Sequence, residues 1–323
     1  MKKLSYIILL SLVMTGITNV LYAHHWRVNN SPNASAQFTN LQTAHDAVQV
    51  MEGDTLYLEP SVSSYGTLTW TRRLVIIGNG YYLASNPQTQ ANTTPSTINN
   101  LEVRSGASGS VIYGCTLSNL NLNNTNTIFF KRNYIGSLDF NSGSGSNLYF
   151  IQNIIEGIAG YGGYVDTYFE NNILFNVGLQ GTSRCTFLNN VILYIYSIYN
   201  STLANNIMTG TQAFGNISTC NYYNNISAGT QFGTANGNQA NVDMNNVFVC
   251  WTSCTTYSPD AKFQLKAGSV ATGAGYGDID CGIFAGNYPY VLSGMPQIPA
   301  IYYLNTQPDG GNLNVNMKIK SHN

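Results

Sequence analysis

The sequence predicts an all-β protein, a right-handed parallel β-helix with a short N-terminal capping helix. Three observations predict this fold. A short motif centred on an asparagine returns every 16 to 21 residues, which matches the length of one β-helical coil. No part of the repeat shows the 3.6-residue period of a helix, and β-branched residues alternate with turn formers. Charged residues make up 8% of the chain and hydrophobic residues 44%, which favours one long folded repeat unit over a disordered chain.

The N-terminus is predicted to be a signal peptide. Lys2 and Lys3 precede an apolar run over residues 6–14, and Ala23 is a small residue suited to cleavage. The run is shorter than the roughly 18 apolar residues that a membrane-spanning helix requires, and no later stretch reaches that length. No cysteine stands directly after this apolar run, so a lipid anchor is not expected. We therefore expect a secreted or cell-surface protein with no membrane span.

The charge of the chain argues against a nucleic-acid partner. The formal net charge is −1, and removal of Lys2 and Lys3 with the signal peptide makes the mature chain more acidic. A protein that follows a phosphate backbone needs a basic surface, which this composition does not supply. A polysaccharide or a cell-surface glycan is the partner class that the sequence leaves open.

The repeat consists of an asparagine and an apolar residue three positions before it. The asparagines are Asn133, Asn153, Asn172, Asn190, Asn206 and Asn225, with a weaker copy at Asn246. The apolar residues are Phe130, Phe150, Phe169, Phe187, Leu203 and Tyr222. Because stacked coils lie about 4.8 Å apart, successive phenylalanine rings should touch inside the coil. The asparagine should mark a corner, since its amide tolerates a left-handed backbone and can hydrogen-bond to the next asparagine.

The coil pattern extends towards the N-terminus with less regularity. Cys115 takes an asparagine position, and Val75 and Ile77 fit the two inward columns of an earlier coil. Residues 39–50 have the apolar spacing of a short amphipathic helix, and a strand follows over residues 55–58. We expect this helix to cover the open end of the coil, because an uncovered end exposes an edge and an apolar interior.

The chain is predicted to contain one folded domain. Residues 1–23 are the expected signal peptide, and residues 24–287 the β-helix with its N-terminal cap. Residues 288–323 are a tail in which prolines interrupt the coil pattern and residues 312–320 alternate like a two-sided strand. The tail is either a cap that packs against the coil or a segment for secretion or attachment.

Two segments resemble proteins of the right-handed parallel β-helix, pectate-lyase-like superfamily. The stretch that begins FTNLQTAHDAV at residue 38 is similar to the start of such proteins, and GSVATGAGYGDIDCGIFAG, residues 268–286, is similar to the closing segment of many secreted bacterial members. With the asparagine coils, the resemblance covers about residues 38–286. It implies the fold, while the superfamily includes lyases, hydrolases, adhesins and members without known activity. A lyase of this superfamily would be expected to show an acidic calcium cluster and an arginine or lysine base.

The six cysteines do not form an obvious set of three disulfides. Cys185 and Cys220 occupy one inward column two coils apart, roughly 10 Å, which exceeds the Cα separation that a disulfide allows. We interpret three cysteines as small apolar fillers of the interior: Cys115, Cys185 and Cys220. Cys250 and Cys254 could close a tight loop, and Cys281 has no evident partner. The histidines lie too far from other ligands for a zinc site, so neither a metal nor a cofactor is expected.

The acidic residues do not form a catalytic pair. Glycoside hydrolysis requires two carboxylates about 5 to 10 Å apart. The acids between residues 101 and 250 are Glu102, Asp139, Glu156, Asp166, Glu170 and Asp243, and no two of them share a column on adjacent coils. No acid-rich coil offers the six to eight oxygen ligands that calcium takes. No catalytic residue is therefore predicted.

One outward column is a candidate for carbohydrate binding. Phe129, Tyr149 and Tyr168 lie four residues before their asparagines on consecutive coils, with Lys131 and Glu170 beside them. An aromatic strip on a rigid sheet can stack sugar rings, with polar groups fixing their orientation. Two alternatives remain open. A loop formed by residues 141–147 or 161–164 buries the strip, or the two charged residues are ordinary solvated surface charges.

Two functions are consistent with these features. The first is a non-catalytic secreted β-helix that binds glycan or has a structural or adhesive role at the cell surface. The alternative is a polysaccharide lyase or glycoside hydrolase with a divergent site on the outer sheet face. The strong coil pattern and the missing pair of acids favour the first.

Overall fold

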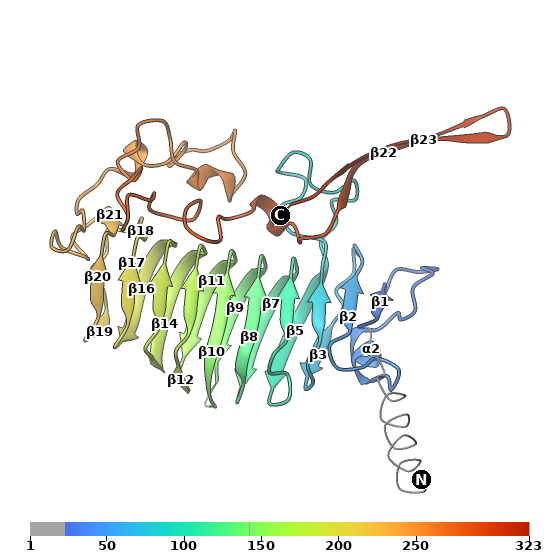
Figure 1. Ribbon diagram of the computed structural model, residues 1–323, viewed down its shortest axis with the longest axis horizontal. Helices are drawn as coiled ribbons and strands as arrows, with labels where there is room; N and C mark the ends of the chain where they lie inside the picture. Colours follow the sequence, from blue (N-terminus) through green and yellow to red (C-terminus); the bar gives the residue numbers. More distant parts are fainter. Residues whose placement is uncertain (1–22, 142, 323) are drawn as a thin grey trace, which may run out of the picture.

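The computed structural model describes residues 23–141 and 143–322, and it is a parallel β-helix (Figure 1). The prediction of an all-β parallel β-helix is confirmed, because 21 strands join in one sheet through parallel pairings. The predicted signal peptide lies almost entirely outside the described residues. Among the described residues, no helix is long and apolar enough to cross a membrane.

The strands stack in two columns, and each coil from β2 onwards contributes to both. The first column consists of β1 (His25–Val28), β2 (Thr55–Leu58), β4 (Val75–Ile77), β6 (Val111–Tyr113), β8 (Asn126–Lys131), β10 (Ser144–Ile151), β13 (Tyr168–Glu170), β15 (Thr186–Leu188), β17 (Thr202–Ala204) and β20 (Asn221–Tyr223). The second consists of β3 (Thr67–Trp70), β5 (Thr97–Arg104), β7 (Thr116–Asn123), β9 (Tyr134–Phe140), β11 (Ile154–Gly160), β14 (Ile173–Ser183), β16 (Val191–Tyr199), β18 (Ile207–Met208), β19 (Asn216–Ser218) and β21 (Ile226–Ser227). The short strand β12 (Gly163–Val165) pairs with both β10 and β14.

The predicted stack of phenylalanines lies in the interior of the coils. Phe130, Phe150, Phe169 and Phe187 are fully buried, and their ring centroids lie 4.8, 5.0 and 4.8 Å apart in succession. The rings are within 11° of parallel. The separation equals the spacing of hydrogen-bonded strands, so the coil geometry itself places each ring on the next.

The repeated asparagines form a continuous buried hydrogen-bonded column. The backbone N–H of Asn153 donates to Oδ1 of Asn172 at 2.8 Å, and its side-chain amide donates to the carbonyl of Phe130 at 2.8 Å. The same backbone bond recurs from Asn133 to Asn225 at 2.8 to 2.9 Å. The buried corner thus has partners for the backbone groups that a tight turn would otherwise leave unpaired.

Two details of the predicted corner are wrong. The left-handed backbone belongs to the residue before each asparagine, for example Asn171 at φ 55° and Asn189 at φ 55°. The column ends with Asn238, whose Oδ1 accepts from the backbone of Asn225 at 2.9 Å, and not with Asn246. Asn246 lies in the 3-10 helix η1 (Met244–Asn246), outside the coils, because the last turn is shortened to 13 residues.

The predicted register of the earlier coil is shifted by one residue. Val75 pairs with Val111 and Ile77 with Tyr113, so these side chains face outwards. Leu74 and Ile76 are the fully buried residues. A shift of one position exchanges the two faces of a strand, and the long insertion after β4 had obscured the spacing.

The N-terminal helix is present but shorter than predicted. The helix α2 (Leu41–Asp46) starts at Asn40, whose side chain accepts a hydrogen bond from the backbone N–H of Thr43 at 2.9 Å. It ends at Ala47, which is extended, so Val48 is 88% exposed instead of continuing the apolar stripe.

The chain then returns along one long side of the stack (Figure 1). After β21 it passes through η1, η2 (Ala261–Phe263) and η3 (Leu292–Gly294). We call residues 274–295 the flank segment. It runs from the last coils towards the first ones, because Asn224 donates to the carbonyl of Ala274 at 3.2 Å while Arg132 donates to that of Met295 at 2.8 Å. The chain ends in an antiparallel hairpin, β22 (Ala300–Asp309) and β23 (Asn312–Lys320), which projects from the stack.

Candidate functional site

The predicted aromatic strip lies on the outer face of β8, β10 and β13. Phe129, Tyr149 and Tyr168 are in register, and their ring centroids lie 4.5 and 5.0 Å apart with planes within 8° of parallel. Most of the described residues in the two segments proposed as covering loops belong to the coil and not to a loop over the strip. Residues 144–147 lie within β10, and residues 163–164 within β12, where Tyr164 is fully buried against Phe140.

The rings of the strip stack on one another, which leaves one ring face open. Tyr149 has a ring on both sides. At one end, the Lys131 ammonium lies 5.3 Å from the centroid of the Phe129 ring. At the other end, the residue in register with Tyr168 is Thr186, and Tyr168 is 37% exposed. The ring face of Tyr168 towards Thr186 is therefore the part of the strip that another flat group can cover.

The column that contains the strip continues with small polar residues. Thr186 pairs with Thr202, and Thr202 with Asn221, on the three coils after Tyr168. We call these three residues the polar platform. Successive coils are about 4.8 Å apart, so the platform presents hydroxyl and amide groups over roughly 10 Å beyond the open ring.

A second outward column lies two residues further along each strand. Lys131, Ile151 and Glu170 are in register, so Ile151 separates the two charged side chains. The column continues with Leu188, Ala204 and Tyr223. Tyr168 and Glu170 are two apart on β13 and share its outer face.

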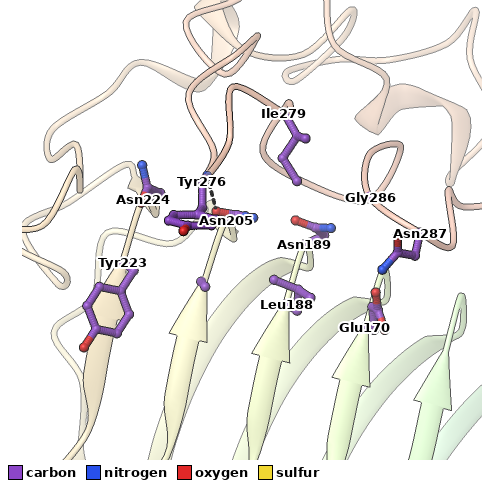
Figure 2. Close-up of a pocket in the computed structure, with 11 residues that line it drawn as sticks. Glu170, Leu188, Asn189, Asn205, Tyr223, Asn224, Tyr276, Ile279, Gly286 and Asn287 are labelled. Carbon is purple, nitrogen blue, oxygen red and sulfur yellow. Dashed lines mark hydrogen bonds between the residues drawn. The ribbon is translucent and has the colours of Figure 1, made fainter.

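The second column forms one wall of a cavity of about 630 Å³, which we call the corner pocket. Figure 2 shows Glu170, Leu188 and Tyr223 on the strand side and Tyr276, Ile279 and Asn287 on the flank segment opposite. The remaining lining residues are Asn189, Ala204, Asn205, Asn224 and Gly286. Neither the flank segment nor the corner asparagines were predicted as part of a site.

Glu170 is the single acid among the residues that line the corner pocket. Burial raises the pKa of its carboxyl group, and no basic residue is among the lining residues to oppose this effect. A protonated carboxyl group donates one hydrogen bond and accepts others, which suits a ligand rich in hydroxyl groups.

Lys131 occupies a separate cavity of about 320 Å³. Its ammonium lies 5.9 Å from the ring centroids of both Tyr113 and Tyr288. Burial, and secondly the neighbouring Arg132, lower the pKa of Lys131. Lys131 and Glu170 are thus both partly buried, and the structure places them in different cavities.

The left-handed corner residues attach the flank segment to the coils. The side chain of Asn171 donates to the carbonyls of Ile283 and Ala285 at 2.8 and 2.7 Å. The side chain of Asn205 accepts from the backbone N–H of Tyr276 at 2.9 Å. The sequence signal for this contact is the side-chain amide that stands one position before each asparagine from Asn153 to Asn225.

Asn189 stands in the same row, and like Asn171 it has an amide oxygen without a partner in the described structure. Its side chain is buried, and it lies where the corner pocket opens between coil and flank segment. The flank backbone passes so close that a Cβ on Gly286 would stand 2.1 Å from Asn189 Nδ2. The flank segment therefore fits against Asn189 sterically without pairing its amide oxygen.

The remaining acids and cysteines do not converge on a second site in the described residues. Asp166 is paired with Arg184, with two N–O distances of 2.8 and 2.7 Å. No group of three or more histidine, cysteine, aspartate or glutamate residues in the described chain lies close enough to hold a metal ion.

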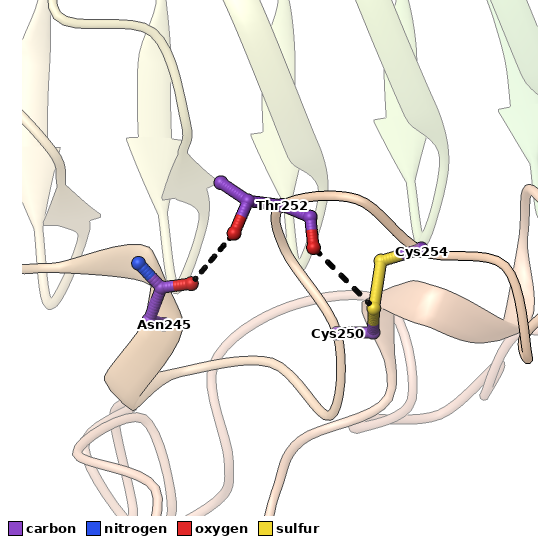
Figure 3. Close-up of a disulfide and its surroundings, with 4 residues drawn as sticks. All are labelled: Asn245, Cys250, Thr252 and Cys254. Atoms are coloured by element: carbon purple, nitrogen blue, oxygen red, sulfur yellow. Dashed lines mark hydrogen bonds between the residues drawn. A yellow bond between two sulfur atoms is a disulfide. The ribbon is translucent and has the colours of Figure 1, made fainter.

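A disulfide joins Cys250 and Cys254 (Figure 3). It closes a tight loop, one of the pairings that the sequence left open. Inside the loop, the Thr252 hydroxyl donates to Asn245 Oδ1 at 3.4 Å. The free cysteines of the described chain are Cys115, Cys185, Cys220 and Cys281.

No protein-family model, curated protein or solved structure matches the chain.

Proposed function

We propose that this protein is a non-catalytic β-helix that binds a glycan on its outer face at the cell exterior. One sugar ring of the glycan would stack on the open face of Tyr168, and the next sugar units would lie over the polar platform beside the corner pocket. The observation that carries this proposal is the open end of the aromatic strip next to a cavity of about 630 Å³. A structural or adhesive role is compatible with the same surface.

The chemistry of the neighbouring groups fits a sugar. Stacking on an aromatic face orients the apolar side of a sugar ring, while fixed polar groups select its hydroxyls. Thr186 and Thr202 supply such groups in line with Tyr168. Glu170, with its raised pKa, supplies both a donor and an acceptor on the adjacent column when protonated.

Binding is favoured over cleavage by the number of acids. Glycoside hydrolysis uses two carboxyl groups about 5 to 10 Å apart. Glu170 is the single acid of the described pocket lining, and Asp166, on the turn before β13, is held by Arg184.

The direct test is retention of the full chain on a panel of neutral and acidic polysaccharides by affinity electrophoresis. Tyr168→Ala should weaken retention about tenfold or more, equivalent to about 1.4 kcal/mol. Its thermal midpoint should stay close to that of the unchanged protein, because Tyr168 is already 37% exposed. Adding Tyr149→Ala should weaken retention little further, since both faces of the Tyr149 ring are occupied.

Tyr196→Ala is a matched control, because Tyr196 is an exposed tyrosine on β16 of the other strand column. It should leave retention unchanged. Equal retention of the Tyr168 and Tyr196 variants would refute the site. A collapse of the thermal midpoint in Tyr168→Ala would instead show that the ring is part of the core.

The second candidate is a polysaccharide lyase or glycoside hydrolase with a divergent site on the same face. The raised pKa of Glu170 favours it, because a general acid must hold its proton near neutral pH. Release of reducing or unsaturated sugar from the same panel would establish this activity and refute a purely binding role. Loss of that release in Glu170→Gln would assign it to the corner pocket.

Export is tested separately. The predicted cleavage after Ala23 implies that the mature protein starts at His24. Mass spectrometry of the protein recovered outside the cell should give that N-terminus. Recovery only of the uncleaved chain inside the cell would contradict the proposed location.

A further inference from the structure

The C-terminal hairpin carries an apolar face that the described part of the chain leaves uncovered. Ile301 pairs with Ile319, and Leu304 with Met317. Alternate residues of a strand share a face, so these side chains lie together with Val315, towards the tip. Six large apolar residues of this face are 40 to 62% exposed: Ile301, Leu304, Leu313, Val315, Met317 and Ile319.

The other face of the hairpin is polar. Its cross-strand pairs are Tyr303 with Lys318, Asn305 with Asn316, Gln307 with Asn314 and Asp309 with Asn312. The hairpin is therefore amphipathic, although it projects from the stack into solvent (Figure 1). A two-stranded sheet of this kind normally buries its apolar face against another layer.

The base of the hairpin is fixed to the body of the protein. The backbone N–H of Ala91 donates to the carbonyl of Ile301 at 2.7 Å, and Arg132 donates to the carbonyl of His322 at 2.8 Å. Ala300 is buried at the point where the hairpin begins. Because this anchoring forms the apolar face in advance, a partner would bind it without a large loss of conformational entropy.

We propose that the apolar face of the hairpin binds the same face of a second copy of this chain. The first argument is area. The apolar face consists of six large side chains that are about half exposed, with Thr306 and Pro308 beside them. It offers accessible surface on the order of 600 Å² per hairpin, so two hairpins would bury about 1,200 Å² in total, the lower bound for a specific interface. A face that packs on itself also generates a closed two-fold dimer.

The second argument is charge. The charged residues of β22 and β23 are Asp309 at the tip and Lys318 and Lys320 at the base. Asp309 and Lys318 lie on the polar face, where the Lys318 ammonium stands over the Tyr303 ring, and Lys320 donates to Gln88. The apolar faces of two hairpins can therefore meet without burying a charge. In an antiparallel arrangement the two-fold axis would pass near the middle of the face, so Val315 of one copy would contact Met317 of the other.

The proposal predicts a dimer in solution. Sedimentation equilibrium and light scattering of the full chain should give the mass of two chains at micromolar concentration. Val315→Lys with Met317→Lys should give the mass of one chain, with a dissociation constant raised more than tenfold. The thermal midpoint should fall only by the part that dimerisation contributes, because both side chains are more than half exposed.

Asn314→Lys with Asn316→Lys is the matched control, since it adds the same charges to the same strand on the polar face. It should leave the dimer intact. A monomeric unchanged protein would overturn the proposal, and so would equal dissociation of both double variants. If the protein is monomeric and sediments with phospholipid vesicles, the face binds a membrane and the proposal is wrong.

Discussion

Asn86 donates a hydrogen bond from Nδ2 to Oδ1 of Asp260 at 3.0 Å, although the two buried residues are 174 positions apart in the chain. Asn86 belongs to the insertion between β4 and β5, and Asp260 caps the 3-10 helix η2. The other oxygen of Asp260 accepts from the backbone of Ser293 at 2.7 Å. One carboxylate therefore joins the insertion, the returning chain and the flank segment that forms one wall of the corner pocket.

Asp260→Ala should destabilise this junction by about 3 kcal/mol or more, because several buried donors would lose their acceptor. Urea denaturation would measure the loss, and limited proteolysis should show earlier cleavage in residues 240–299. Asp243→Ala is the control, since Asp243 caps η1 at an exposed position and should cost about 1 kcal/mol or less. Similar losses for the two variants would contradict the role assigned to Asp260.

Phe169→Ala should lower the free energy of unfolding by about 3 to 5 kcal/mol, as removal of a large buried ring does. Phe169 is fully buried with rings at 5.0 and 4.8 Å on its two sides. Tyr168→Ala, one residue earlier on the same strand, should cost far less because it faces outwards. Chemical denaturation of both variants measures the difference, and a larger loss in Tyr168→Ala would mean that the two faces of β13 are assigned wrongly.

Asn172→Ala should cost about 3 kcal/mol through unpaired buried groups. Oδ1 of Asn172 accepts from the backbone and side chain of Asn153 at 2.8 and 3.0 Å, and its amide donates to the carbonyl of Phe150 at 2.8 Å. Asn119→Ala provides the comparison, because Asn119 is exposed and makes one bond of 3.3 Å to the carbonyl of Asn99. That variant should stay within about 0.5 kcal/mol of the unchanged protein.

Glu170→Gln should make the protein more stable at neutral pH. Burial raises the pKa of Glu170 in the folded state. Its contribution to folding stability is therefore complete below the unfolded pKa of about 4.3, and it is lost as the pH rises through the folded pKa. The stability gained by Glu170→Gln should appear above the folded pKa and vanish below the unfolded pKa. Thermal midpoints measured across pH 3 to 8 would test it.

Asp166→Asn should show the opposite pH dependence. The hydrogen bond from Arg184 lowers the pKa of Asp166, so its stabilising contribution is present above the unfolded pKa and is lost as the pH falls through the folded pKa. The effect should be small because the pair is solvent-exposed. If the stability changes of Glu170→Gln and Asp166→Asn followed pH in the same direction, the assignment of Glu170 to a partly buried position would be contradicted.

The repeat was predictable because it depends on neighbours at a nearly constant sequence distance. Phe150 and Phe169 meet since each coil returns the chain to the same point after about 19 residues. The prediction was less accurate where an insertion or a short turn changed that distance. For this reason the sequence pattern places Val75 on the wrong face, and it ends the repeat at Asn246 where the structure ends it at Asn238.

The candidate site was only partly predictable. The sequence brought Phe129, Tyr149 and Tyr168 together with Lys131 and Glu170 on one outer face, and the structure places all five on that face. It did not reveal that the rings cover one another, because ring orientation depends on side-chain packing. It also missed the flank segment, because the residues of that segment do not repeat, although the coil residues that bond to it, such as Asn171 and Asn205, hold the same place in successive coils.

The sequence by itself determined the coil, its aromatic interior and its column of asparagines, since these contacts recur with a period that can be read along the chain. The tertiary structure alone decided where the non-repeating chain lies, which ring face stays open beside Glu170, and that Asn86 meets Asp260. Those contacts are made once, between segments with no shared period, so only the packing of the folded chain specifies them.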